Sequence, residues 1–195
     1  MGKYKKIIIT PLKWEKNILK KVLKQFNMLE YNIISLDVLR DINKLLEVYN
    51  YDRGDFFIGI SAGNKKTNVE LGDLVIIKKV IYLKNEEYKY FYFKYNQNLI
   101  KTSQKIKEAT SLYTDTFFYE NDEKKYNFNF DIIEMESYKI FNILGEEVTF
   151  FRVIVDFGIK KSNFNLYNYK KSIERFYIKG LKILIENLKK GEGYA

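Results

Sequence analysis

Short apolar runs rich in β-branched residues alternate with amphipathic segments along the whole chain, and this alternation restricts the fold more than any other feature. The apolar runs predict buried strands at 6–10, 31–35, 56–60, 109–113, 130–133 and 148–155. Apolar residues at helical spacing predict helices over 15–26, 36–49, 135–143 and from 169 or 170 to 188. Strands that alternate with helices are typical of α/β proteins. The sequence therefore predicts an α/β fold, a three-layer α/β/α sandwich with a central mixed sheet.

The length and composition limit both the domain count and the chemistry. A chain of 195 residues favours a single domain, which would span 1–195. The chain has no cysteine and no histidine, which excludes disulfides, thiolate metal sites and the usual general base. Any acid–base chemistry must therefore use Asp, Glu, Lys or Tyr side chains, and we expect neither a metal nor another cofactor.

The formal net charge of +9 raises the question of nucleic-acid binding. The excess is almost all lysine and accompanies abundant Ile, Asn, Tyr and Phe, a bias that favours a solvated basic surface over a binding site. Arginine, which recognises phosphate in a bidentate manner, occurs only four times. We therefore do not expect a nucleic-acid partner. The alternating tyrosines and lysines between 80 and 98 are compatible with base stacking, but they fit a β-hairpin or a dimer contact as well.

No run is long and apolar enough to predict a transmembrane helix. The apolar run that follows the basic N-terminus, 7–10, is too short for the core of a signal peptide. We expect a cytoplasmic protein with no membrane partner.

Acidic residues follow two of the predicted strands. Glu134 and Glu136 come after the apolar run 130–133, at the start of a helical pattern, and Asp156 ends the run 148–155. Carboxylates are favoured at helix N-termini, so the first pair fits a capping role. Ligand sites of open α/β sheets lie beyond the carboxyl ends of strands, so the same acids are candidates for a site.

Two more segments place small or acidic residues at strand ends. Glu15 opens the first predicted helix just after the first strand, where a first-turn acid also interacts well with the helix dipole. Ser61 and Ala62 follow the strand 56–60, and small residues there let the backbone approach a ligand closely.

Four ordered blocks resemble a known family. The first block is Glu-Met-Glu at 134–136 together with the following Arg-Val-Ile-Val-Asp at 152–156. The other three are Ser-Ala-Gly at 61–63, Leu-Gly-Asp-Leu-Val-Ile at 71–76 and Thr-Asp-Thr-Phe-Phe at 114–118. Together they look like the nucleoside phosphorylase and nucleosidase superfamily, in particular the methylthioadenosine/S-adenosylhomocysteine nucleosidases. The resemblance implies a phosphorylase/hydrolase-like fold, nucleoside metabolism and a homodimer that acts on a purine nucleoside.

The resemblance also implies roles for single residues. Asp156 would be the general acid that protonates N7 of the purine, and Glu15 would orient or activate water. Glu136 would bind the ribose hydroxyls, with Met135 beside the sugar and Glu134 nearby. Three residues would frame the nucleoside: Ser61, Ala62 and Phe117.

The chain departs from the family pattern at several positions. The glycine-rich turn of relatives is replaced by Ser35-Leu36-Asp37, and Val155 stands where relatives often have serine before the catalytic acid. The missing glycine and arginine signals favour a hydrolase that uses water over a phosphorylase. A nucleosidase-like hydrolase is thus the first hypothesis, and a catalytically degenerate nucleoside-binding or regulatory protein of the same fold is the alternative.

Overall fold

The structure is a computed structural model and describes most of the chain. The described residues are 5–28, 30–36, 42–84, 87–99, 105–116, 126, 128–158 and 165–192.

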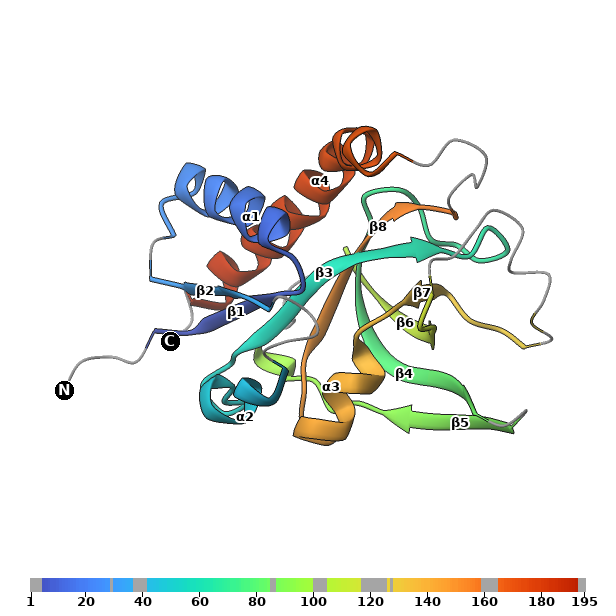
Figure 1. Cartoon of the computed structure of the whole chain (residues 1–195). Coiled ribbons are helices and arrows are strands. Elements are labelled where there is room, and N and C mark those ends of the chain that lie inside the picture. Colours follow the sequence, from blue (N-terminus) through green and yellow to red (C-terminus); the bar gives the residue numbers. More distant parts are fainter. Residues whose placement is uncertain are drawn as a thin grey trace.

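Strands and helices alternate in the first and last parts of the described chain, whereas five strands follow one another in its middle with only a short 3₁₀ turn between two of them (Figure 1). The strands are β1 (Ile7–Thr10), β2 (Asn32–Ser35), β3 (Phe56–Gly63), β4 (Leu74–Lys84), β5 (Glu87–Tyr92), β6 (Ile106–Tyr113), β7 (Ile132–Glu134) and β8 (Phe150–Asp156). The α-helices are α1 (Lys13–Gln25), α2 (Leu45–Val48), α3 (Ser137–Leu144) and α4 (Leu166–Glu192), and two short 3₁₀ turns are η1 (Ile42–Lys44) and η2 (Gln97–Leu99).

All eight of these strands belong to one mixed sheet, in the order β2-β1-β3-β7-β6-β4-β5. Strand β8 lies off this path and pairs in parallel with β3 and antiparallel with β4. The pairs β3–β8, β8–β4, β4–β6, β6–β7 and β7–β3 therefore close the central part of the sheet on itself. This closure brings the end of β7 beside the carboxyl-terminal half of β3, although the two segments lie about seventy positions apart in the sequence.

Helices cover both faces, so the architecture is a three-layer α/β/α sandwich, as predicted (Figure 1). Helices α1 and α4 lie together on one face, and their apolar stripes pack on buried residues of β1, β3 and β8. Helices α2 and α3 lie on the other face over a second apolar cluster. The all-buried pattern of β1, and of β8 up to its last residue, follows from this double covering.

The sequence located most elements, but it predicted no strand at 74–79, where β4 begins, and one of its helices is largely wrong. The pattern over 36–49 predicts one helix, but the described part contains only the 3₁₀ turn η1 and the four-residue helix α2. Within 43–49 Leu45 is buried and Leu46 is 65% exposed. The apolar stripe that packs on the sheet there is therefore short, and tertiary contacts do not stabilise a longer helix in this range. Of the readings left open for 80–98, the β-hairpin is present as the antiparallel pair β4–β5, which joins 79–84 to 87–92.

A glycine sets the distance between α4 and the sheet. Gly180 lies so close to β8 that an added Cβ would lie 2.5 Å from Cγ2 of Val153, a fully buried side chain. Because α4 carries residues of the site described below, this close approach also fixes their position relative to the end of β8.

We expect Gly180→Ala to destabilise the protein by about 1–3 kcal/mol, since overpacking at Val153 outweighs the gain of about 0.5–1 kcal/mol that alanine brings inside a helix. Urea unfolding followed by circular dichroism measures this. As a control, Val153→Ala should cost less in the Gly180→Ala background than in the wild type, because it makes room for the added methyl group. A stabilised Gly180→Ala protein would contradict the close packing.

Candidate active site

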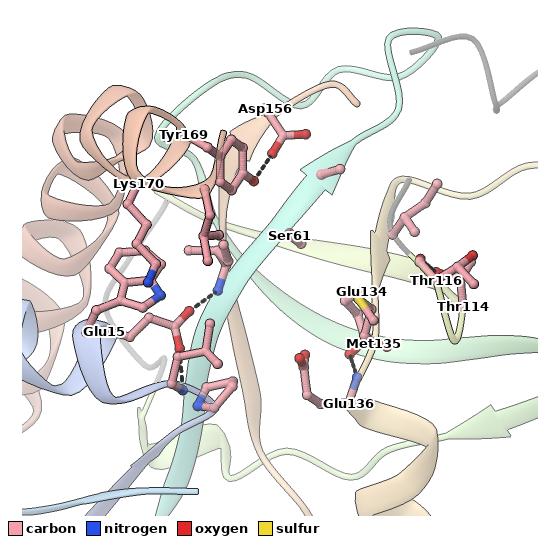
Figure 2. A pocket seen from close by; sticks show the side chains of 17 residues that line it. Glu15, Ser61, Thr114, Thr116, Glu134, Met135, Glu136, Asp156, Tyr169 and Lys170 are labelled. Atoms are coloured by element: carbon pink, nitrogen blue, oxygen red, sulfur yellow. Dashed lines mark hydrogen bonds between the residues drawn. The ribbon is translucent and has the colours of Figure 1, made fainter. Parts of the chain in front are cut away.

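A pocket of about 290 Å³ opens where β1, β3 and β8 end and where β7 passes into α3. Its lining comes from segments distant in the sequence: the start of α1, the end of β3, the residues after β6, the β7–α3 junction, the end of β8 and the start of α4 (Figure 2). The walls are largely apolar, and carboxylates project from three of these segments. This combination of an apolar cavity with a few convergent polar groups is typical of a small-molecule site.

Glu15 lies at the floor of the pocket and is completely buried. Its Oε2 accepts the backbone N–H of Leu12 at 2.9 Å, within the first turn of α1. Its Oε1 accepts the N–H of Ile60 at 3.1 Å. The register of β1 on β3 runs only to Phe57, so no strand partner from β1 reaches that N–H. Glu15 thus caps its own helix and also pairs a free N–H of β3.

Arg152 supplies a positive charge at the centre of the cluster. Its side chain is fully buried on β8, and Nη2 lies 3.1 Å from Oε2 of Glu134 and 3.1 Å from Oε2 of Glu136. A buried charge without a partner costs several kcal/mol, so this pairing ties β8 to the β7–α3 junction. Arg152 is paired with these two glutamates, and Asp156 has other partners.

Glu134 is occupied by backbone contacts. Its Oε2 accepts the N–H groups of Glu136 at 2.9 Å and Ser137 at 2.8 Å, and its Oε1 accepts the hydroxyl of Ser137. These contacts satisfy N–H groups at the start of α3 that no helical carbonyl can reach. Glu134 therefore caps α3, the alternative that its position in the sequence also allowed.

Glu136 has a more open position, since 18% of its side chain is exposed. Figure 2 shows its carboxylate directed into the space between the β7–α3 junction and β3. Met135 lines the same wall.

Asp156 ends β8 on the side of the pocket nearest to α4. Its Oδ1 accepts the N–H of Gly158 at 2.7 Å, and its Oδ2 accepts the hydroxyl of Tyr169. Burial raises the pKa of the Asp156 carboxyl, and the hydrogen bonds from Tyr169 and Gly158 oppose that rise.

The acids near the floor titrate far from their ordinary range. Burial raises the pKa of Glu15 to about 8, and the negative charge of Glu136 adds to the effect. Burial likewise raises the pKa of Glu136 to about 7, although the guanidinium of Arg152 opposes it. Such shifts cluster at functional sites because catalytic acids and bases need a pKa close to the working pH.

Two polar groups of the pocket lining lack a hydrogen-bond partner among the described residues. They are the Oγ of Ser61 and the indole Nε1 of Trp14, and both atoms are buried. Buried polar groups in native proteins nearly always have a partner. A ligand with polar atoms could satisfy both.

The structure brings together all but one of the residues that the sequence singled out. Seven line the pocket: Glu15, Ser61, Ala62, Glu134, Met135, Glu136 and Asp156. Phe117 lies outside the described residues. Roles for these residues in binding or catalysis remain predictions.

Further residues of the pocket lining were not singled out from the sequence, among them Trp14, Tyr169 and Lys170. They lie at or next to the start of predicted amphipathic helices, where a helix face explains them equally well, so the sequence offered no signal. A signal did exist for Arg152, because a cation within an otherwise apolar strand requires a buried partner.

The sequence matches no protein-family model and no curated protein sequence, but solved structures match the whole fold. A mutant Helicobacter pylori MTAN with 5′-methylthioadenosine in its active site is similar over 97% of this chain and 100% of that chain, with a TM-score of 0.67 and 14% identity. The Arabidopsis thaliana 5′-methylthioadenosine nucleosidase gives a TM-score of 0.67 and 10% identity over 96% of this chain and 95% of that chain. Futalosine hydrolase of Helicobacter pylori gives a TM-score of 0.66 and 13% identity over 96% of this chain and 98% of that chain.

The chain has the nucleosidase fold. The family resemblance seen in the four sequence blocks therefore agrees with the three-dimensional structure over nearly the whole chain. Among the described residues no helix is long and apolar enough to cross a membrane.

The raised pKa values predict how stability depends on pH. In the unfolded chain these carboxyls titrate near their ordinary pKa of 4.5, so between that pH and about 8 the folded protein binds more protons. The stability contributed by protonated Glu15 and Glu136 is therefore fully present below about pH 4.5 and is lost progressively as the pH rises from there to about 7 and 8. With no histidine and no cysteine in the chain, few other groups titrate in this range.

We expect the free energy of unfolding to fall by about 4 kcal/mol between about pH 6 and pH 9, and to fall less in Glu15→Gln. Thermal or urea unfolding across this range measures both proteins. The exposed Glu147 provides the control, since Glu147→Gln should keep the wild-type pH dependence. An identical pH dependence in Glu15→Gln would contradict the raised pKa.

Proposed function

We propose that this protein is a nucleosidase that hydrolyses the N-glycosidic bond of a purine nucleoside or thionucleoside. The observation that carries the proposal is the convergence of Glu15, Glu136 and Asp156, from three separate segments, on one apolar pocket of a nucleosidase fold. Purine nucleosides combine an apolar, stackable base with ribose hydroxyls, which suits apolar walls with a few buried acceptors.

In this proposal Asp156 acts as the general acid. Its proton moves to N7 of the purine while the bond between the ribosyl C1′ and N9 breaks, so the base leaves as a neutral molecule. The raised pKa of Asp156 supports the role, because an acid must hold its proton at the working pH. A carboxyl group with an ordinary pKa would be ionised at neutral pH.

In its ionised form Glu15 would orient the attacking water and accept its proton, and because its pKa is about 8 this form is the minor one at neutral pH and increases as the pH rises. As the hydroxyl adds to C1′, the proton passes to Glu15, and exchange with solvent restores both acids. Glu136 would accept hydrogen bonds from the ribose hydroxyls, with Met135 packed beside the sugar. Glu134, whose contacts hold the start of α3, would act through the position of Glu136.

Water suits this pocket better than phosphate as the nucleophile. Arg152 is already bound to Glu134 and Glu136, and Lys170 is the basic side chain among the described lining residues. A phosphate dianion would have to lie near several carboxylates with little positive charge to offset the repulsion. The homodimer, which the family resemblance alone suggests, and the cytoplasmic location are further parts of the proposal.

The test is release of free purine from methylthioadenosine, S-adenosylhomocysteine, adenosine and inosine, with and without phosphate. We expect release without phosphate, and a loss of about 10²–10⁴-fold in kcat for Asp156→Asn with nucleoside binding retained. Glu15→Gln should also lose turnover, whereas Glu147→Gln should match the wild type.

The other outcomes discriminate between the alternatives. Unchanged turnover in Asp156→Asn would refute the acid role, and release that requires phosphate would make the protein a phosphorylase. Nucleoside binding by calorimetry with no turnover of any substrate would support the catalytically degenerate binding protein instead.

A further inference from the structure

The carboxyl group of Asp156 is held by two donors of different kinds. The backbone N–H of Gly158 binds Oδ1 at 2.7 Å, which is a local contact two residues along the chain. The hydroxyl of Tyr169 binds Oδ2 from the first turn of α4 (Figure 2). The local turn alone would fix one oxygen, so the direction of the second depends on α4.

The neighbouring side chains of β8 cannot replace this donor. Val155, the preceding residue, is aliphatic and 2% exposed. Among the described residues, Tyr169 is the one side chain that donates a hydrogen bond to Asp156. Arg152, four residues earlier on the same strand, is committed to the two glutamates.

The position of Tyr169 is itself well determined. Its N–H donates to the carbonyl of Asn165 at 2.9 Å, and its carbonyl accepts the hydroxyl of Ser172 at 2.7 Å. Further along α4, the buried Tyr177 and the contact between Gly180 and β8 anchor the helix. The phenol hydroxyl therefore arrives at Asp156 from a rigid element, as an effective positioning contact requires.

We propose that Tyr169 is the positioning residue of Asp156, holding the carboxyl group in the rotamer that faces the pocket. The catalytic part of this inference rests on the proposed nucleosidase function, and the structural part does not. Tyr169 keeps its proton at neutral pH, because burial and the charge of Asp156 raise the pKa of the phenol. It is thus a constant donor, and its hydrogen bond favours the ionised form of Asp156 against the effect of burial.

Tyr169→Phe removes the hydroxyl and keeps the ring, so the packing of α4 is preserved. The matched control is Tyr167→Phe, two positions away on the same helix, where the side chain is 75% exposed. Both variants should unfold within a few degrees of the wild type, which establishes that any other change is local.

The first measurement is the titration of the Asp156 carboxyl by ¹³C NMR, with the signal assigned by its loss in Asp156→Asn. Loss of a hydrogen bond to the charged form should raise the pKa of Asp156 by about one unit or more in Tyr169→Phe, and leave it unchanged in Tyr167→Phe. An unchanged titration in Tyr169→Phe would overturn the inference. This readout needs no enzymatic activity.

The second measurement is a double-mutant cycle on kcat for purine release. We expect Tyr169→Phe to lower kcat by about 10-fold or more in the wild type and to have no further effect in the Asp156→Asn background, since a positioning residue acts only through its partner. Equal losses in both backgrounds would show that Tyr169 acts elsewhere, and would overturn the inference.

The two measurements separate this inference from the proposed function. If the wild type releases no base from any nucleoside, the nucleosidase proposal fails, and the titration still decides whether Tyr169 holds Asp156. If the wild type is active while Tyr169→Phe and Tyr167→Phe give the same pKa of Asp156 and the same kcat, the nucleosidase proposal stands and the role of Tyr169 is refuted.

Discussion

The buried guanidinium of Arg152 is the contact on which the rest of the site depends. It lies within β8 with no solvent exposure and pairs at 3.1 Å with both Glu134 and Glu136. Removing one partner from such a pair leaves an uncompensated charge in the interior, which costs about 3–5 kcal/mol. The pairing therefore locks β8 to the β7–α3 junction. Glu134 in turn caps α3, so the direction of that helix is coupled to the same cation.

Negative charge exceeds positive charge around this cation. Glu15, Glu134 and Glu136 surround a single arginine. Burial raises the pKa of Glu15 to about 8 and that of Glu136 to about 7, so protonation of these two carboxyl groups reduces the excess of negative charge. A site of this kind can bind or release a proton near neutral pH without a histidine. The absence of histidine from the chain is thus compatible with acid–base chemistry in this pocket.

The candidate site was largely accessible from the sequence because its acids follow strands or open helices, and those positions depend on local periodicity. The capping role of Glu134 was also one of the two alternatives that the sequence offered. Tyr169 was not accessible, because its contact with Asp156 spans thirteen residues, six of them outside the described part of the chain. The helix predicted over 36–49 is wrong for most of its described part for a related reason, since within 43–49 Leu45 is buried while Leu46 is 65% exposed.

The sequence by itself determined the α/β class, the two helix-covered faces of the sheet and the strand ends at which the acids lie, because each follows from hydrophobic periods of two or 3.6 residues. Only the tertiary structure decided the partners of those acids. The closure of the sheet through β8 places Arg152 against two glutamates and leaves Asp156 to Tyr169 and Gly158. Such pairings depend on strand register and on burial between distant segments, and burial also sets the pKa values, so no local pattern could predict them.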